Sequence, residues 1–172
     1  GVCVRRIVDN ESSCVMIRYK IVAVGKIKEN YLKEAISEYA KRISRFAAME
    51  IVEVEETFFN GEPSEKEKEK ILQEEGKRIL AKVEGCVVAL DIDGTQLTST
   101  QLSQRLEALQ QNFSCLTFVV GGSYGLSQEV KNAAQLRLSF GKITLPHQLC
   151  RVVLAEQLYR ACTIRNNVPY HK

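Results

Sequence analysis

The chain has 172 residues, a net charge of +3, and 45% apolar and 26% charged residues, which is typical of one soluble globular domain. It contains no run of about 18 apolar residues, so a membrane-spanning helix is excluded, and its first residues lack the features of a secretory signal. In a protein that is not exported, six cysteines indicate reduced thiols, and two histidines without a ligand cluster argue against zinc. We therefore expect a cytoplasmic protein without a metal site.

The positive charge is unevenly distributed along the chain. Residues 16–48 carry eight Lys or Arg against three Glu, and residues 136–172 carry six against one. Residues 49–85 are acidic, with eleven Glu against six Lys or Arg. Two basic ends around an acidic middle suit a polyanionic partner such as a nucleic acid. The alternative is surface charge that varies along the chain without a functional reason.

Strand and helix signals alternate from residue 16 onward. Short apolar runs indicate buried strands, and apolar residues spaced three and four apart indicate helices. Ser64 and Glu67 form a capping box at the start of one helix. In chain order, we predict a strand at 21–24, a helix from Tyr31 to Phe46, a strand at 51–54, a helix from Ser64 to about Val83, a strand at 86–91 that ends at the Asp93-Gly94 turn, a helix from about Ser99 to Gln111, a strand at 116–120, a short helix from 127, a strand at 136–139 and a helix from Pro146 to about Ile164.

This alternation indicates an α/β fold with a mostly parallel sheet and helices on both faces. Residues 16–172 are expected to form one domain. Residues 1–15 have no clear period and precede Met16, so we expect an extension or a cloning remnant that is poorly ordered. Ligands of parallel sheets bind beyond the carboxyl ends of the strands. Leu90, Gly121 and Phe140 lie at such ends, which predicts a binding site along that edge.

The last predicted helix is apolar around nearly its whole circumference. Such a helix needs cover on more than one side. A sheet on one side and a second subunit on the other would provide it, so the pattern favours a two-fold homodimer. The alternative is a helix buried within one thick domain.

A glycine turn, Gly121-Gly122-Ser123-Tyr124-Gly125, follows the strand at 116–120. Glycines at a strand end let a ligand approach the backbone without a Cβ in the way. The segment matches neither G-x-G-x-x-G nor a Walker loop, so a phosphate cradle is not indicated. A tight turn between a strand and a helix is the alternative.

Two residues near the start of the last helix are candidates for chemistry. The positive end of the helix dipole disfavours a charged imidazole at His147, which leaves a neutral ring able to bind a substrate. The alternative is a capping or packing histidine. Arg151 lies one turn later among apolar neighbours and needs an anionic partner, such as phosphate, a carboxylate or Glu156. An internal ion pair is therefore the alternative for Arg151.

The chain ends in Tyr170-His171-Lys172, which offers an aromatic ring for stacking, a titratable ring and a cation. Chain ends usually fray, which is the alternative to a functional tail. A flexible tail can still become ordered when RNA binds.

Several ordered segments together resemble the RlmH family. They are Ala23-Val24-Gly25-Lys26, Leu90-Asp91 with Gly94, Gly121 to Ser127, Thr144 to Arg151, Glu156 to Ala161, and Pro169-Tyr170-His171-Lys172. The resemblance covers essentially residues 16–172. It implies a SPOUT-class fold with a trefoil knot in the C-terminal half. It also implies an S-adenosylmethionine-dependent methyltransferase that acts on N3 of a pseudouridine in large-subunit (23S) ribosomal RNA.

The resemblance also implies where the cofactor binds. The predicted cofactor residues coincide with the strand ends described above and comprise Leu90, Gly121, Gly122, Phe140, Gly141, Lys142, Ile143, Thr144 and Leu145. Glycines and apolar residues at these positions can surround an adenine with backbone donors and acceptors.

For the reaction, our first candidate for the base that removes the N3 proton is His171, and the second is His147. Arg151 would stabilise the imide anion, and Tyr170 would stack on the flipped base. The proposed phosphate contacts are Lys26, Lys28, Lys41, Arg42 and Arg160. The expected partner is ribosomal RNA within the assembled large subunit or whole ribosome.

Two other classes of function share parts of this pattern. A nucleotide-binding, flavodoxin-like domain has the same alternation and a glycine turn, and it would not respond to S-adenosylmethionine. A non-catalytic ribosome-associated factor would use the basic ends alone and would not need Gly121.

Overall fold

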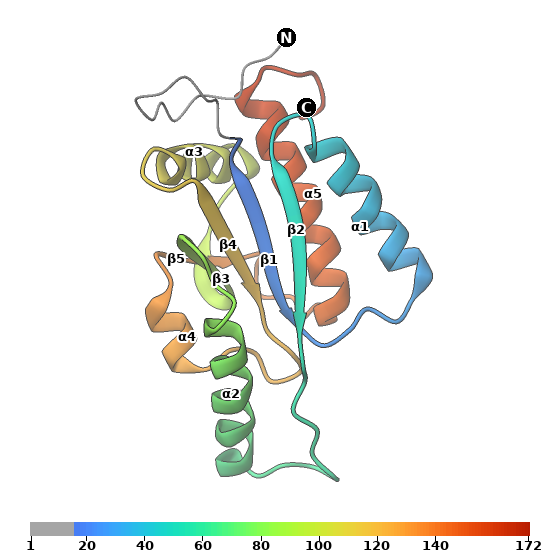
Figure 1. The fold of residues 1–172 in the computed structure, drawn as a ribbon, viewed down its shortest axis with the longest axis vertical. Helices are drawn as coiled ribbons and strands as arrows, with labels where there is room; N and C mark the ends of the chain where they lie inside the picture. Colours follow the sequence, from blue (N-terminus) through green and yellow to red (C-terminus); the bar gives the residue numbers. More distant parts are fainter. Residues whose placement is uncertain (1–15) are drawn as a thin grey trace.

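The computed structural model describes residues 16–172, and the expected extension at 1–15 lies outside the described residues. Within the described range, five strands and five helices alternate (Figure 1). In chain order they are β1 (Arg18–Val24), α1 (Asn30–Ile43), β2 (Ala48–Val54), α2 (Glu65–Leu80), β3 (Cys86–Gln96), α3 (Ser99–Gln110), β4 (Cys115–Val120), α4 (Gln128–Ala133), β5 (Leu136–Ser139) and α5 (His147–Arg165).

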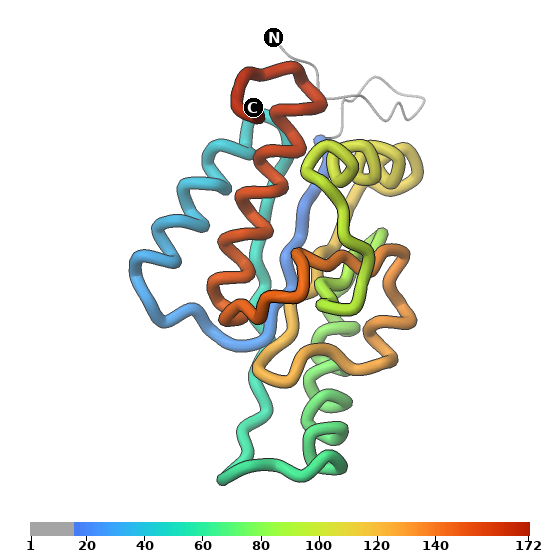
Figure 2. The backbone as a smooth tube through the Cα atoms, turned by 180° about the vertical axis from the view of Figure 1, so that it is seen from behind, coloured from blue at the N-terminus to red at the C-terminus, as the bar shows by residue number. Residues whose placement is uncertain are grey.

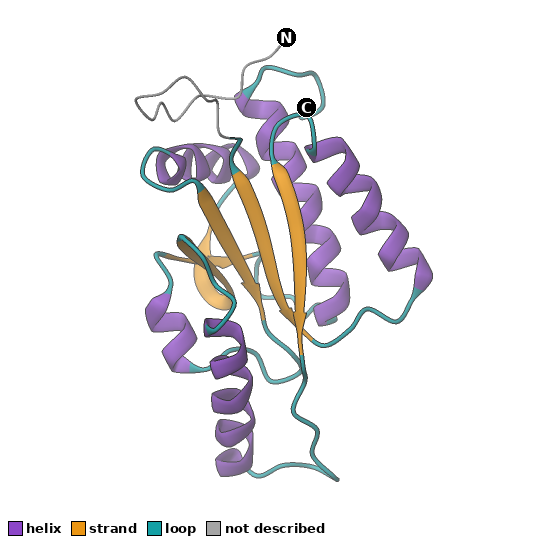
Figure 3. Ribbon diagram, in the orientation of Figure 1, coloured by secondary structure: helices purple, strands orange, loops and turns teal. Residues whose placement is uncertain are grey.

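The strands form one sheet in the order β2-β1-β4-β3-β5, and all its pairings are parallel. Helices lie on both faces of the sheet (Figure 3). One core cluster joins the sheet to α1, α3 and α5, and a second joins the opposite face to α2 and α4. The predicted α/β fold with a parallel sheet is therefore confirmed. The trefoil knot stays a prediction.

Side chains of β1 alternate between these two clusters, as the pleat of a strand requires. Tyr19, Ile21 and Ala23 belong to the cluster under α5, while Val22 and Val24 belong to the cluster under α2. All of them are buried, because β1 is a central strand with both faces covered. Strands of this kind appear in a sequence as continuous apolar runs.

Helix α5 lies against the sheet and between two other helices. It packs beside α1 along its length (Figure 2) and also contacts α3. Leu154 and Leu158 of α5 have no exposed surface, and Ile43 and Leu102 from the flanking helices join the same cluster. The apolar circumference of α5 is thus covered largely within one chain. Val152, Val153 and Tyr159 of α5 are only half-buried and Leu149 is exposed, so part of the helix is still available to a second subunit and the homodimer stays a prediction.

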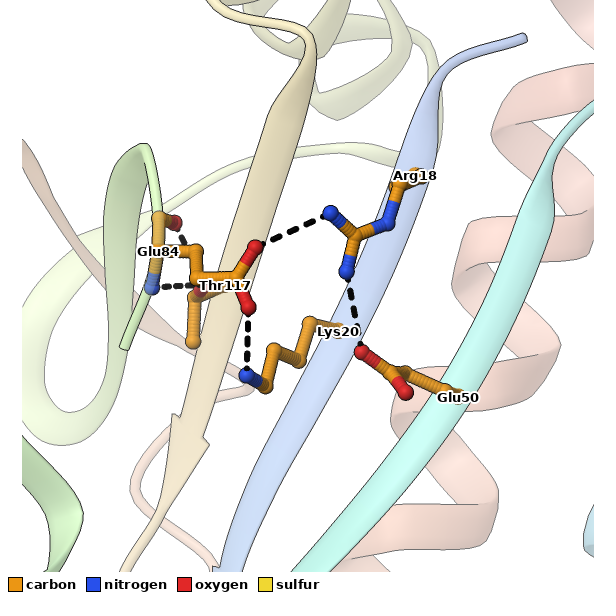
Figure 4. A network of polar contacts seen from close by, with 5 residues as sticks. All are labelled: Arg18, Lys20, Glu50, Glu84 and Thr117. Atoms are coloured by element: carbon orange, nitrogen blue, oxygen red, sulfur yellow. Dashed lines mark hydrogen bonds and ion pairs between the residues drawn. The ribbon is translucent and has the colours of Figure 1, made fainter. Parts of the chain in front are cut away.

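The opposite face of the sheet is polar near the amino ends of its strands, where α2 does not reach (Figure 1). Glu84 accepts hydrogen bonds from Arg18 at 2.9 Å and from Lys20 at 3.0 Å, and Arg18 also reaches Glu50 at 3.1 Å (Figure 4). Thr117 anchors the backbone of Glu84 by donating to its carbonyl and accepting from its amide. Lys20 is only 7% exposed, so its pairing keeps a largely buried charge satisfied.

The third strand extends further than predicted. Its pairing with β5 is interrupted after Leu90 and resumes at Thr95, so the expected end at the Asp93-Gly94 turn is wrong. A Cβ on Gly94 would lie 2.6 Å from the carbonyl oxygen of Arg137, so glycine allows the close approach of β5. The predicted bounds of the other helices and strands agree with the structure to within a few residues. None of the helices between residues 16 and 172 is long and apolar enough to cross a membrane.

Candidate active site

The glycine turn after β4 depends on close backbone contacts. The amide of Gly125 donates to the carbonyl of Gly122 at 3.1 Å. A Cβ on Gly121 would lie 2.4 Å from the carbonyl oxygen of Gly125, which leaves no room for a side chain. Gly125 has a φ of +87°, a conformation that other residues rarely adopt. The backbone of this turn is therefore not covered by side chains at the carboxyl end of β4.

A second segment, residues 140–146, follows β5 and approaches this turn at the same carboxyl edge of the sheet. Ser139 donates from its hydroxyl to the carbonyl of Ile92 at 2.9 Å and accepts from the amide of Gly141 at 3.1 Å. These bonds tie the segment to β3 as it leaves the sheet. A Cβ on Gly141 would meet no atom within 4 Å, so its backbone faces open space.

These segments enclose a pocket of about 470 Å³, which we call the rim pocket. The predicted cofactor residues among its lining are Leu90, Gly122, Phe140, Gly141, Ile143, Thr144 and Leu145. Gly121 lies behind the wall, where it shapes the turn, and Lys142 is exposed outside the lining. The structure thus brings together most of the residues that the strand-end argument selected.

A second pocket of about 640 Å³ lies at the carboxyl ends of β1 and β2, and we call it the outer pocket. His147, at the first position of α5, lies in its wall. Burial, with a smaller effect from the charge of Arg151, lowers the pKa of His147 below its ordinary value. The lowered pKa favours the neutral ring that the sequence predicted, although its causes are burial and Arg151 and not the helix dipole.

Arg151 is fully buried and makes three hydrogen bonds of 2.8 Å. They run to the carboxylate of Glu53 and to the carbonyls of Val24 and Gly25. Burial lowers the pKa of Arg151, and the bond to Glu53 opposes this effect. Its partner is therefore Glu53 and not Glu156, and the alternative of an internal ion pair is confirmed. A side chain without exposed surface does not touch a substrate, so we replace the predicted contact with the imide anion by a positioning role.

The C-terminal tail is packed against the C-terminal half of α5, from its middle residue Glu156 to Arg160. Tyr170 lies edge-on against Tyr159, with ring centroids 4.8 Å apart, and its hydroxyl donates to Glu156 at 3.2 Å. Arg160 lies over the Tyr170 ring and reaches Nδ1 of His171 at 3.2 Å. The alternative of a frayed tail is therefore wrong for Tyr170 and His171 in this structure.

The tail and His147 lie at opposite ends of α5 (Figure 1). The helix has 19 residues and is about 28 Å long. Within one chain, His171 and Tyr170 are thus at the amino edge of the sheet, while both pockets are at the carboxyl edge. The four predicted catalytic residues are not brought together in one chain.

The chain was next compared with known proteins. A family model described as "Predicted SPOUT methyltransferase" matches residues 17–171. The chain belongs to the SPOUT methyltransferase family. It is 51% identical over 159 residues to "Ribosomal RNA large subunit methyltransferase H" from Streptococcus pneumoniae strain CGSP14, which spans 91% of this chain and 100% of the relative. The protein of that name from strain JJA gives the same values.

Solved structures are more distant. The putative methyltransferase Lpg2936 from Legionella pneumophila, in complex with SAM, is 10% identical, with a TM-score of 0.44 over 86% of this chain and 67% of that one. The SpoU methyltransferase AviRb from Streptomyces viridochromogenes, in complex with AdoMet, is 12% identical. Its TM-score is 0.40 over 88% of this chain and 61% of that one.

Two acidic residues of this SPOUT methyltransferase support the site, although neither was predicted from the sequence to be a site residue. Asp91 lines the rim pocket, is 7% exposed and lies 3.5 Å from both Lys131 and Arg137. Glu75 of α2 is buried and accepts from the amide of Thr57 at 3.0 Å, which anchors the loop after β2. Burial raises the pKa of Glu75. The available signal for Asp91 was its position as an ionisable residue directly after the apolar run at 86–90.

The predicted phosphate contacts of the SPOUT methyltransferase differ in availability. Lys26, Lys28 and Lys41 are exposed, and the first two line the outer pocket. Arg42 is paired with Glu38 at 3.0 Å, and Arg160 is held by Glu156 at 2.6 Å. Arg160 is therefore held by Glu156, Tyr170 and His171 and is not free to contact RNA phosphates.

Proposed function

We propose that this SPOUT methyltransferase transfers a methyl group from S-adenosylmethionine to large-subunit ribosomal RNA, with N3 of a pseudouridine as the acceptor. The observation that carries the proposal is the rim pocket, because residues selected from the sequence as cofactor contacts line it together. The relative named for large-subunit ribosomal RNA is aligned over its whole length, which supports the same class of substrate.

The rim pocket fits this cofactor in size and chemistry. Gly125 and Gly141 both present open backbone to it, since a Cβ at either would meet no atom within 4 Å. Leu90 and Phe140 supply apolar surface for an adenine. When bound, S-adenosylmethionine supplies a methyl group that is already activated on a sulfonium, so the protein has to position the acceptor.

We assign the removal of the N3 proton to His147. Its ring is neutral at pH 7, it borders the outer pocket, and a neutral imidazole nitrogen can accept a proton. His147 would accept the proton of N3, which frees the in-plane lone pair of the imide nitrogen for the methyl group that S-adenosylmethionine would supply. The base must lie within about 2.6–3.2 Å of that proton or be connected to it by one water.

His171 takes a different role from the one first predicted. An arginine only donates hydrogen bonds, so Nδ1 of His171 accepts from Arg160 and, in the neutral ring, the proton is on Nε2. In this tautomer Nε2 carries the N–H donor, and the lone pair of Nδ1 is already occupied by Arg160. His171 therefore suits the stabilisation of negative charge on the imide, the role that buried Arg151 does not serve.

We infer a homodimer from the separation of the tail and the pockets. A tail at the amino edge of one chain contributes to the chemistry only at the carboxyl edge of a second chain. The rim also carries exposed apolar residues that a second copy would cover, namely Tyr124, Ile92, Leu149 and, at 80% exposure, Ile143. The expected substrate is an assembled ribosome or large subunit in the cytoplasm.

The first test is incubation of the purified protein with methyl-labelled S-adenosylmethionine and ribosomes from a strain that lacks the modification. Label at one large-subunit pseudouridine is expected. Cofactor binding without label would move the substrate elsewhere. No response to S-adenosylmethionine, combined with binding of a mononucleotide, would favour the flavodoxin-like alternative. Ribosome binding that survives Gly121→Val without any methylation would favour the non-catalytic factor.

A further inference from the structure

The outer pocket is larger than the rim pocket and has no role in the account of the cofactor. It lies between the loop that follows β1 and the loop that follows β2, at the lower edge of the sheet in Figure 1. His147 and Gln148 close it from the start of α5. Gln148 accepts from the amide of Lys28 at 3.3 Å, so the start of α5 and the first loop are joined.

The two pockets share a wall. Ser123 lines the rim pocket, Glu56 lines the outer pocket, and the Ser123 hydroxyl donates to the Glu56 carboxylate at 3.5 Å. Residues 145–147 also run between the two pockets. Leu145 lines the rim pocket, and His147 lines the outer pocket. The rim pocket and the outer pocket therefore adjoin each other at the contact between Ser123 and Glu56.

Two polar groups converge on the same point of the outer pocket. A Cβ on Gly25 would lie 3.5 Å from Oε2 of Glu56 and 4.0 Å from Nε2 of His147. Gly25 has a φ of +86° and no side chain, so both groups overlook bare backbone. An imidazole nitrogen and a carboxylate oxygen that both lie beside Gly25 can each accept one proton from the same planar ring.

The charges in the pocket select the kind of occupant. Glu53, Glu55 and Glu56 line it, and this acidic lining disfavours a phosphate group. Glu53 is already bound by Arg151 and by the amide of Ile27 at 2.8 Å, which leaves the Glu56 carboxylate for a ligand. An uncharged heterocycle with N–H donors meets these conditions, because a carboxylate is an acceptor only.

The outer rim of the pocket provides the remaining contacts of a nucleotide. Phe58 lines the pocket and is 86% exposed, so its ring is available to a ligand. Exposed aromatic rings stack on unpaired bases. Lys26 and Lys28 line the same pocket and are exposed, in positions suited to the phosphates that flank a flipped nucleotide.

We propose that the outer pocket receives the flipped acceptor base, stacked on Phe58, and that Glu56 accepts the N1–H by which pseudouridine differs from uridine. Pseudouridine is attached to its ribose through carbon, so N1 keeps a proton that uridine lacks. With Glu56 on N1–H, His147 is left to accept the proton of N3. The inference rests on the proposed function and adds the residue that selects pseudouridine.

The test compares two ribosome preparations, one with pseudouridine and one with uridine at the acceptor position. The uridine form comes from a strain without the corresponding pseudouridine synthase. Single-turnover methylation and cofactor affinity are measured for the wild type, Glu56→Ala, Glu56→Gln and Phe58→Ala. The matched controls are Glu62→Ala and Phe59→Ala, which change the same loop outside the pocket lining. The melting temperature of each variant shows that it is folded.

We expect Glu56→Ala to lower kcat/KM about 10- to 100-fold on pseudouridine ribosomes, as for a lost hydrogen bond to a charged group, and less than about twofold on uridine ribosomes. Glu56→Gln keeps an acceptor oxygen and should lose less. Phe58→Ala should lower both substrates equally, by about 5- to 150-fold. Cofactor affinity and both control variants should match the wild type.

Equal losses on both substrates for Glu56→Ala, or no loss at all, would overturn the assignment of Glu56. A Phe58→Ala variant as active as Phe59→Ala would overturn the stacking role and, with it, the location of the base. If the wild type methylates neither ribosome preparation while binding S-adenosylmethionine, the proposed function itself fails. That result differs from the others because it does not depend on any variant.

Discussion

The two ends of α5 differ in how completely their polar groups are paired. At the tail end, Arg160 is engaged by Glu156, by the ring of Tyr170 and by His171, so its donors and charge are satisfied within the chain. At the other end, His147 faces an open pocket. The contrast indicates that one end is built to present side chains in a fixed orientation and the other to receive a ligand. A homodimer would bring the two kinds of end together.

The largest expected effect belongs to the open end. His147→Ala should lower the single-turnover rate about 100- to 10,000-fold, the usual contribution of a general base. Because burial lowers the pKa of His147, the wild-type rate should fall only below pH 6.5, where the ring becomes protonated. The variant should lose this acid limb. A pH–rate profile from pH 5 to 9 checks both points, and an unchanged acid limb in His147→Ala would assign the base elsewhere.

The same pKa shift affects stability. Since the folded protein holds the neutral ring, the unfolded chain binds the proton more readily, and stability falls as the pH drops below about 6.5 until the lower folded pKa is passed. His147→Gln should flatten this part of the stability curve. Urea unfolding at pH 7.5 and pH 5.5 separates this contribution from the effect on rate.

The next largest effect concerns Arg151, whose hydrogen bonds connect the first turns of α5 to the ends of β1 and β2. Arg151→Met should reduce the free energy of unfolding by about 3 kcal/mol, at the lower end of the range for a broken buried pair because Glu53 is partly exposed. The exposed pair of Glu38 and Arg42 provides the control, since Glu38→Gln should leave the free energy of unfolding nearly unchanged. Urea denaturation measures both. An Arg151→Met variant with full stability and no activity would restore the direct catalytic role of Arg151.

The smallest expected effect tests whether the tail acts on a second chain. His171→Ala should lower the rate about 10- to 100-fold, as for the loss of one hydrogen bond to a charged group. A mixture of His171→Ala and His147→Ala chains, co-expressed and purified together, should be more active than either alone, because mixed dimers contain one intact site. Mixing the two proteins without subunit exchange is the control. Activity no higher than that of the better single variant would place the tail and His147 in the same chain.

Local signals were sufficient for most of the fold and for the rim pocket. The capping box of Ser64 and Glu67 forms as predicted, because its residues are three apart and need no information from elsewhere. Leu90, Gly122 and Phe140 meet because strands of one parallel sheet end at one edge, a consequence of fold class alone.

The remaining features depend on contacts between distant parts of the chain. The partner of Arg151 is Glu53, which is 98 residues away, and no periodicity connects them. The break in β3 is set by the backbone of Arg137 against Gly94, which is likewise a tertiary contact. The packing of Tyr170 on Tyr159 could not be read from a terminal tetrapeptide that is usually mobile in other chains.

The order of the strands also bears on how the protein avoids unwanted association. Its two free edges are β2 and β5, and an unpaired edge strand is a template for intermolecular pairing and aggregation. Strand β5 has only four residues, which limits the ladder that another chain could form. Strand β2 is longer but carries the charged side chains Glu50 and Glu53, which are paired with Arg18 and Arg151 and would have to lose water against a facing strand. Both edges are therefore protected against fibrillar growth, which leaves the apolar rim as the surface where two copies can join into a closed assembly.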